Sequence, residues 1–491
     1  MKNNLTRRAL LQHAAWTIAA TALPRGLALA AESVSPITTK LSMYMSEARD
    51  RVLPDDVTAK VKDHVLDTFA AMISGSQLPP GHAAIEFARA YGGEKISTVA
   101  ASNVVCGPIE AALANGVLAH SDETDDSHAP SQSHPGCAVV PAALAAGEKF
   151  AITGNHFLRA VALGYDIGPR VTMTFGAVDL QLKGHKSTHS IAGVFAAAAS
   201  AGCAANLDAQ QMRWLLDYSA QQCSGILAWQ RDIEHIEKSF VFAGMPARSG
   251  TTAALLVQSG WTGVADILSG PDNFLLAFAP QPPSAPDAAG LVERLGERYE
   301  VARTNIKKWT VGSPIQAPLD AMEILRKRHP FDAEHVQQVI VRLAVLEAKT
   351  VNNREMPDIC LQHMMAVMLL DKTASFQAAH DKPRMQDPAI LRQRAKIQLL
   401  PDEELQQRLP RREAIVEVML TDGTHLTERV EAVRGTAENP MTRDEVVAKA
   451  RDLMAPVLGE ATCTTLIQKV LELENVKNIL ELRPLLSAPS H

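Results

Sequence analysis

The sequence predicts a mainly α-helical protein, in which a large all-helical domain is built from both ends of the chain and carries a smaller α+β domain. Composition is one reason, because 46% of the 491 residues are hydrophobic, only 4% are aromatic, and alanine is abundant. Close-packed helices suit that mixture better than a β-sandwich, whose strands favour aromatic and β-branched residues. The other reason is a change of pattern along the chain, from helical spacing to short strands and back.

The first part of the chain, residues 53–270, repeats its apolar residues at helical spacing almost throughout. Pro54 and the two acids after it are typical of a helix start. Further helices are expected at residues 111–118, 141–148, 156–164, 190–205 and 208–220. Residues 190–205 are nearly all small and apolar, which predicts a helix buried on all sides.

The second part begins at a proline-rich linker, residues 280–286. A β-branched alternating run at residues 336–346 predicts a strand, and residues 415–420 and 426–430 flank Asp422-Gly423 as the strands of a hairpin. Thr442 is then expected to cap a final helical stretch that continues to Leu485. These patterns divide the chain into an all-helical domain (residues 31–275 and 441–491) and an α+β domain (residues 276–440).

The first thirty residues have the features of an export signal. Arg7 and Arg8 precede an apolar stretch that is too short and too polar to span a bilayer well. Residues 28–30, Ala-Leu-Ala, form the small-x-small pattern of a signal peptidase site. The arrangement resembles a twin-arginine signal peptide. We therefore expect the twin-arginine export machinery as a partner of the precursor, cleavage near Ala30, and a periplasmic protein that contacts no membrane; the alternative is a frayed N-terminal helix.

Charge and cysteine content exclude several classes of protein. The net charge of −6 and the isoelectric point near 6.3 argue against a nucleic-acid partner, which needs a basic face to neutralise phosphates. The six cysteines form no C-x-x-C pair, and their spacing supports neither a zinc site nor an iron–sulfur cluster. We expect mostly buried thiols.

The densest group of polar residues, at positions 120–136, contains four acids and three histidines. Carboxylates beside imidazoles are what proton transfer requires, because one group removes a proton while another protonates a leaving group. Two other interpretations are open. The segment could be a solvated acidic loop in which an Asp or a Ser caps the next helix. It could also bind a divalent metal, although no spacing comparable to H-E-x-x-H supports a metal site.

Three further segments, residues 183–189, 237–250 and 307–316, could supply charged or hydrogen-bonding groups. The first precedes the expected buried helix, whose N-terminus offers free N–H groups to a carboxylate, although its serine or threonine could simply cap that helix. A lysine by itself is more often a solvated surface charge than a ligand. The candidates in these segments are His185, His189, Lys238, Lys307 and Gln316.

Together these segments resemble the MmgE/PrpD family, which includes 2-methylcitrate dehydratase, cis-aconitate decarboxylase and an iminodisuccinate epimerase. The resemblance spans essentially the whole chain beyond the predicted signal peptide. Residues 120–135 match the family pattern H-x-x-D-F-D-D-T-H-x-P-S-x-x-H-P in register. The weaker matches are residues 193–199 to G-x-F-G-A-A-A, residues 244–250 to G-R-A-A-R-A-G, residues 320–321 to D-A, and residues 434–440 to R-G-x-x-x-N-P.

The resemblance implies that the smaller domain is a lid over the helical domain, usually in a homodimer. It also implies work on small polycarboxylates without a metal or an organic cofactor. We therefore predict a cofactor-independent lyase, with a hydro-lyase of the 2-methylcitrate dehydratase type as the leading interpretation. The alternatives are epimerisation or decarboxylation at the same site, a periplasmic carboxylate-binding protein without catalysis, and a metal hydrolase.

The predicted reaction begins with removal of the proton α to a carboxylate of a small hydroxy or polycarboxylic acid. Glu123, Asp126 or His134 would take that proton. Lys238 and Lys307 would stabilise the enolate-like charge that develops.

Other residues would hold the substrate or its leaving group. His185 or His189 would assist the leaving hydroxyl, and the resemblance places Ser127, Lys307 and Gln316 against the substrate. The sequence also departs from the family pattern. Family histidines, a tyrosine and a lysine fall on other residue types here, namely Ser187, Gly312, Gln316, Thr350 and Asp358. This altered shell argues against cis-aconitate and 2-methylcitrate as substrates.

Overall fold

The computed structural model describes residues 34–279 and 286–488. The predicted signal peptide (residues 1–30) and nearly all of the predicted linker (residues 280–285) lie outside these ranges. Within them, helices dominate beside one two-stranded and one four-stranded sheet. The mainly α-helical prediction is therefore confirmed.

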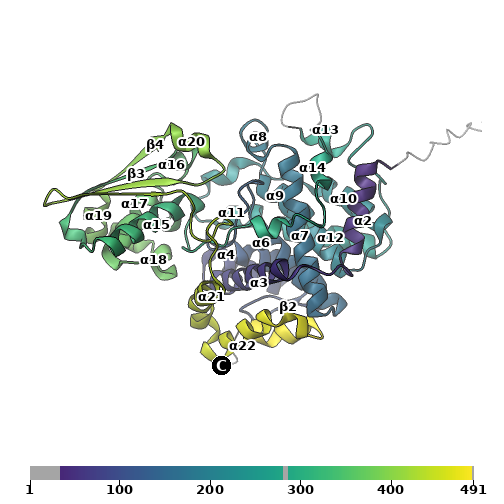
Figure 1. Cartoon of the computed structure of the whole chain (residues 1–491). Helices are drawn as coiled ribbons and strands as arrows, with labels where there is room; N and C mark the ends of the chain where they lie inside the picture. Colours follow the sequence, from purple (N-terminus) through teal and green to yellow (C-terminus); the bar gives the residue numbers. More distant parts are fainter. Residues whose placement is uncertain (1–33, 280–285, 489–491) are drawn as a thin grey trace, which may run out of the picture.

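Buried apolar side chains fall into two large clusters. One cluster contains side chains from residues 41–306 and 441–486, and the other contains side chains from residues 309–433. We call these regions the helical part and the α+β part. Figure 1 shows the α+β part on the left and the helical part on the right, with the C-terminal helices below the helical part. Residues 291–306, which the sequence assigned to the α+β domain, pack on the helical cluster.

The helical part is formed mostly by helices and contains a single short strand pair within the described residues. The elements before the α+β part are α2 (Pro36–Glu47), α3 (Asp55–Gly75), α4 (Pro79–Tyr91), β1 (Ser97–Thr98), β2 (Val105–Cys106), α5 (Pro108–Ala119), α6 (Gly136–Phe150), α7 (Gly154–Thr174), α8 (Ala177–Leu182), α9 (Thr188–Ala204), α10 (Ala209–Gln222), η1 (Leu227–Arg231), α11 (Ile236–Ser239), η2 (Phe240–Gly244), α12 (Met245–Gln258), α13 (Phe274–Phe278), α14 (Ala289–Val292) and η3 (Glu300–Arg303). The helical part is completed by elements from the end of the chain, namely α21 (Arg443–Leu458), α22 (Glu460–Leu471), the 3-10 turns η7 (Leu473–Asn475) and η8 (Ile479–Leu482), and α23 (Arg483–Leu486).

Apolar periodicity predicts these helices well. Each of the five expected stretches lies within one helix or within one residue of its ends, and Pro54 directly precedes α3. The sequence analysis missed α2 and the β1–β2 pair. Two-residue strands are too short to show alternation. Helix α2 is held by long-range contacts, since the N–H of Ser35 and the hydroxyl of Thr38 both bond to Asp266.

Helix α9 is buried along nearly its whole length, as predicted. It packs against α6, α7, α10 and α12. Small residues permit this close packing: a Cβ added to Gly193 would lie 2.7 Å from the Cβ of Pro246 on α12. The alanine- and glycine-rich sequence of residues 190–205 is thus the cause of the tight core beneath the candidate site.

One helical run in the described residues, Ile236–Gln258, is long and apolar enough to cross a membrane by length and composition alone. It consists of α11, the π-helical turn η2 and α12. In its most apolar window, 61% of the residues are buried inside the protein. Such burial is typical of the core helix of a globular protein.

The α+β part has a four-stranded sheet in the order β4-β3-β5-β6. Strand β3 pairs in parallel with β4 and antiparallel with β5, and β5 and β6 form a hairpin. Helices α15 and α17 contact this sheet. The elements in chain order are α15 (Ser313–Arg328), η4 (Ala333–His335), β3 (Val336–Ala344), α16 (Val345–Val351), η5 (Pro357–Ile359), α17 (Leu361–Asp371), α18 (Phe376–His380), η6 (Pro383–Gln386), α19 (Pro388–Arg394), β4 (Ile397–Asp402), α20 (Glu403–Arg408), β5 (Ala414–Leu420) and β6 (His425–Val430).

Both strand predictions in this region are confirmed, with small differences at the ends. Val339, Val341 and Leu343 alternate on the buried face of β3. The strand stops at Ala344, because Val345 already begins α16. In the hairpin turn Gly423 has a φ of 88°, a conformation that glycine adopts at little cost.

The C-terminal segment returns to the helical part, as expected. Thr442 caps α21 in a capping box with Glu445, and α21 packs against α3. From α21, the Lys449 ammonium donates to Asp67 on α3 at 2.6 Å and to the carbonyl oxygen of Thr124 at 3.0 Å. The end of the chain therefore helps to fix the loop that carries the candidate site.

Candidate active site

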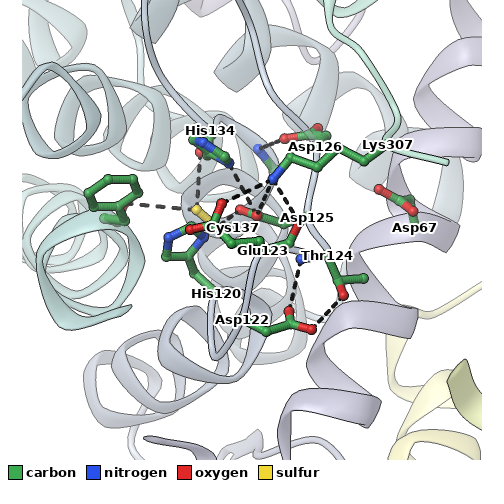
Figure 2. A network of polar contacts seen from close by, with 12 residues as sticks. Asp67, His120, Asp122, Glu123, Thr124, Asp125, Asp126, His134, Cys137 and Lys307 are labelled. Carbon is green, nitrogen blue, oxygen red and sulfur yellow. Dashed lines mark hydrogen bonds and ion pairs between the residues drawn. The ribbon is translucent and has the colours of Figure 1, made fainter. Parts of the chain in front are cut away.

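The loop between α5 and α6, residues 120–135, is the centre of the candidate site. Most of its residues are buried, and the Asp125 and Asp126 carboxylates are fully enclosed. The solvated acidic loop that the sequence left open is therefore excluded. Figure 2 shows the side chains of this loop turned toward one another and toward Lys307. Burial of so many ionisable groups requires that they pair with one another.

Asp125 accepts hydrogen bonds from two histidines. Its Oδ2 lies 2.9 Å from Nδ1 of His120, and its Oδ1 lies 3.1 Å from Nδ1 of His134. Burial alone would raise the pKa of Asp125, but the two imidazoles hold it well below the ordinary value. An ionised carboxylate only accepts hydrogen bonds, so both rings carry a proton on Nδ1. The Nε2 of His134 then presents a lone pair.

His134 is suited to act as a general base. Burial, aided by the charge of Lys307, lowers its pKa, and Asp125 offsets this only in part. The ring is therefore neutral at pH 7, with its orientation fixed by Asp125. An imidazole oriented by a carboxylate is the arrangement that serves as a base in the Ser-His-Asp triad.

Glu123 lies between two lysines. The Lys238 ammonium forms an ion pair with its Oε1, while Lys307 donates to its backbone carbonyl at 2.7 Å and lies 3.5 Å from Oε2. Burial would raise the pKa of Glu123, but Lys238 and Lys307 hold it well below its usual range. These charges come from distant parts of the chain. Lys238 lies on α11, and an antiparallel bridge between Ser127 and Asn305 brings Lys307 to the loop.

Asp126, predicted as a possible base, has a structural position instead. Its Oδ2 accepts from Nδ1 of His64 at 2.8 Å and from the hydroxyl of Tyr165, and its Oδ1 accepts from the N–H of Gly136 at 3.0 Å. Because both oxygens are occupied by α3, α7 and the start of α6, the carboxylate holds the loop in place. A Cβ on Gly136 would lie 2.8 Å from Oδ2 of Asp126, which explains the glycine after the His-Pro pair.

Of the two histidines before α9, only His189 belongs to the cluster. Its ring lies 5.2 Å from the ring of His134 and stacks on Phe242 at 3.6 Å. Burial lowers its pKa well below the ordinary value. His185 is exposed at the surface, so the structure does not bring it to the site. His185 precedes the isolated bridge between Lys186 and Ile226, whereas His189 lies in the first turn of α9.

A cavity of about 210 Å³ lies between the two parts of the protein and has Ser127, Lys307 and Gln316 in its lining. It therefore adjoins the cluster at Lys307. Gln316 has no free donor for a substrate, because its Nε2 donates to the carbonyls of Trp309 and Val311, and its Oε1 already accepts from the N–H of Trp309. This predicted substrate ligand thus stabilises the segment that follows Lys307.

The α+β part covers the cluster with two titratable groups that sequence analysis did not assign. Nε2 of His380 on α18 lies 3.0 Å from Oδ2 of Asp122. Although burial alone would lower the pKa of His380, Asp122 and Asp358 raise it. Burial raises the pKa of Asp358 to about 7. Thr350, the position of the family tyrosine, is exposed instead and its hydroxyl donates to the carbonyl of Leu346.

Three residues of the cluster were missed as functional candidates, namely His120, Asp125 and His235. Asp125 belongs to the matched motif, and its position between His120 and His134 explains why the motif places it there. His235 precedes α11 and its ring lies 5.2 Å from that of His120. Only its position three residues before Lys238 could have drawn attention to it.

Two groups of side chains in the described residues have ligand atoms within 4.8 Å of one another, as a metal site requires: His120 with Asp125 and His134, and His120 with Glu123 and His235. In both groups the carboxylate is already paired. Lys307 lies near both acids, and Lys238 contacts Glu123. The positive charges favour an anion over a cation here. All six cysteines are free, and five are buried.

The helical scaffold, the oriented imidazole and the paired lysines are features of an enzyme site, and their arrangement is suited to proton transfer. The chain belongs to the MmgE/PrpD family: the model described as the MmgE/PrpD N-terminal domain matches residues 39–286, and the model of the MmgE/PrpD C-terminal domain matches residues 309–473.

Relatives with established names are similar over most of their length. A cis-aconitate decarboxylase of Aspergillus terreus (strain NIH 2624 / FGSC A1156) is 24% identical over 487 residues, which is 93% of this chain and 96% of the relative. The cis-aconitate decarboxylases of Mus musculus and Homo sapiens are each 24% identical over 465 residues, which is 89% of this chain and 91% and 92% of the relatives.

Proposed function

We propose that the protein is a cofactor-independent lyase that removes a proton α to a carboxylate of a small hydroxy or polycarboxylic acid and eliminates water. The family and the relatives named as decarboxylases support lyase chemistry on small carboxylic acids. The observation that carries the proposal is the oriented His134, whose partner Asp125 lies 3.7 Å from the Lys307 ammonium. A base next to a cation is what abstraction of a weakly acidic proton requires.

In the proposed reaction, Nε2 of His134 takes the α proton and the C–H electron pair moves into the substrate carboxylate. Lys307 and Lys238 stabilise the negative charge of this enolate-like intermediate. The electron pair then forms the C=C bond while the C–O bond to the hydroxyl breaks. The His134 imidazolium returns its proton to the departing hydroxyl, which leaves as water. Charge and protons balance without a cofactor.

Decarboxylation is the second candidate, because the relatives are named for it. In that reaction a C–C bond breaks in place of a C–O bond, and the same lysines would stabilise the carbanion. The altered residues of the α+β part favour elimination. Gly312, where the family decarboxylase pattern has a histidine, has no side chain, and its N–H bonds to the carbonyl of Asp358 while its carbonyl accepts from the N–H of Ile315.

Proton NMR of the reaction in heavy water separates the candidates. Small hydroxy di- and tricarboxylates that raise the thermal midpoint would be incubated with the protein. Elimination gives new alkene signals at constant carbon number. Decarboxylation releases carbon dioxide, and epimerisation incorporates deuterium without a new alkene. A ligand that binds but shows no new alkene, no carbon dioxide and no deuterium would contradict the proposed enzymatic activity and favour a binding protein.

The proposal also includes the oligomeric state of the protein and its location in the cell. We propose a homodimer, for which light scattering on a sizing column gives the mass directly, and a periplasmic location. A monomer at micromolar concentration would contradict the former.

A further inference from the structure

Five buried polar atoms around Lys238 have no hydrogen-bond partner among the described residues. They are Nε2 of His120, Nδ1 of His189, Nε1 of Trp229 and both ring nitrogens of His235. Buried polar groups are nearly always hydrogen-bonded in folded proteins. Such a concentration of unpaired atoms beside an enzymatic base therefore marks a place where a polar group of the substrate supplies the partners.

His235 stands out among these residues by its backbone. Its φ is 65°, in the left-handed region, where it caps the start of α11. A residue other than glycine is uncommon in this conformation, and such residues cluster at ligand-binding and active sites. The side chain is only 5% exposed. The fold therefore holds a buried imidazole in a strained position without using either nitrogen.

The surroundings of His235 favour a neutral polar ligand over a cation. Atoms of Glu123, His120 and His235 lie within 4.8 Å of one another, but Glu123 is already paired with two lysines. Burial, with the charge of Lys238, lowers the pKa of His235 well below its ordinary value. A neutral imidazole has one N–H donor and one acceptor. His120 adds a second acceptor, since its Nδ1–H is bonded to Asp125 and its Nε2 is free.

We propose that His235 binds the hydroxyl group of the substrate and makes the site selective for hydroxylated acids over analogues that lack the hydroxyl. An N–H of His235 donates to the hydroxyl oxygen, and Nε2 of His120 accepts the hydroxyl hydrogen. A carboxylate would leave the His120 acceptor unpaired, because it has no hydrogen to donate. Sequence analysis expected His185 or His189 to assist the leaving hydroxyl, and the role of His235 rests on the proposed function.

The chain contains a matched control. His363 on α17 is also buried with both ring nitrogens unpaired. It lies in a regular helix whose neighbours belong to the apolar cluster of the α+β part, and the geometry gives it no place at the site. His363→Phe therefore tests the general effect of removing a buried, unpaired imidazole.

The test compares binding of paired acids: malate with succinate, and citrate with tricarballylate. Calorimetry in a His134→Ala background prevents turnover of the bound acid. With His235 present, we expect the hydroxylated member of at least one pair to bind about 10- to 100-fold tighter, since an unmade hydrogen bond in a buried polar site lowers affinity by that order. His235→Phe should bring the ratio close to one, and His363→Phe should leave it unchanged.

Two further variants show whether a lost preference reflects the missing imidazole or a misfolded protein. Asn tolerates the left-handed backbone and keeps a donor and an acceptor, so His235→Asn should keep part of the preference. His235→Gly removes ring and strain together, and should lose the preference with an unchanged or higher thermal midpoint. The inference is overturned if the preference survives in both His235→Phe and His235→Gly, or if the deoxy acids bind equally well before mutation.

Other outcomes have a distinct meaning. Failure of every acid to bind, together with no turnover by the unmutated protein, would overturn both the proposed function and this inference. Turnover without any hydroxyl preference would overturn the inference alone. A transition metal that copurifies and is lost in His235→Phe would identify His235 as a metal ligand and would also overturn the inference.

Discussion

Nδ1 of His134 lies 3.1 Å from Oδ1 of Asp125, and the other oxygen of that carboxylate accepts from His120 at 2.9 Å. One buried carboxylate thus sets the tautomer of two rings. For His134 this leaves Nε2 as the only nitrogen able to accept a proton. For His120 it leaves Nε2 as an acceptor directed away from Asp125. The two rings, 5.1 Å apart, therefore have different tasks although they share one partner.

His134→Ala tests the proposed base. We expect kcat to fall by about 10²- to 10⁴-fold, the usual contribution of general acid–base catalysis. His156→Ala is a control, because His156 on α7 is bonded through Nε2 to the carbonyl of Cys203 at 2.8 Å, outside the cluster. Turnover should be measured per folded molecule beside the thermal midpoint. Near-normal turnover in His134→Ala would shift the role to Glu123 or His189.

The pH dependence of kcat/KM reports the same residue. His134 must be neutral to accept a proton, and its pKa lies below the ordinary value of 6.5. Activity should therefore be level near pH 7 and fall on the acid side, with a midpoint below 6.5. Asp125→Asn removes a negative charge that favours the imidazolium, so it should move this midpoint to still lower pH and also reduce kcat. A midpoint above 6.5, or one that Asp125→Asn leaves in place, would contradict the assignment.

Asp126→Asn should affect stability and leave chemistry intact. The substitution places an amide N–H₂ opposite the donors that now bond to Asp126, and a buried donor left unpaired costs about 1–3 kcal/mol. We expect a loss of that order in the free energy of unfolding by urea, with kcat per folded molecule nearly unchanged. Asp179→Asn is a suitable control, since Asp179 is exposed and pairs only with Lys183 one turn along α8. A large loss of kcat at normal stability would restore Asp126 as a catalytic candidate.

Local pattern was sufficient to predict the helices and the hairpin, because their causes are local. Helix α9 follows from a run of small apolar residues, and the hairpin follows from alternation around Asp422-Gly423. Helix α2 was missed although Ser35 and Pro36 are a local start signal, whereas its contact with Asp266, 228 residues from Thr38, has no local signal. Nothing in the sequence near either residue indicates that contact.

The sequence was sufficient to locate the loop that forms the site, but not to predict which side chains of that loop contact one another. The motif identified residues 120–136, but only the fold decides which carboxylate faces which partner. Asp125 and Asp126 are neighbours, yet one faces His134 and the other faces α3 and α7. The two lysines lie 115 and 184 residues from Glu123. His185 and His189 differ because His185 lies before α9 and is exposed, whereas His189 lies in the first turn of α9 and is half-buried within the cluster.

The proposed export would depend on residues outside the described structure. Replacing both Arg7 and Arg8 with lysine should leave the precursor in the cytoplasm, because the paired arginines distinguish this signal from a general one. Arg25→Lys, which keeps the pair, serves as the control. Cell fractionation with immunoblotting measures the distribution. Normal periplasmic yield of the double variant would contradict the twin-arginine route.

Removal of metal should leave the enzyme active. Glu123, His120 and His235 approach one another closely enough to bind an ion, but two ammonium groups already contact Glu123. Like unit charges about 4 Å apart repel by about 4 kcal/mol at the effective dielectric constant of such sites, and a divalent ion would face both lysines. Elemental analysis of active protein should therefore find no stoichiometric transition metal, and dialysis against a chelator should leave kcat unchanged. Activity that is abolished by the chelator and restored by one particular ion would show that the ion displaces the lysines, and would require a different mechanism.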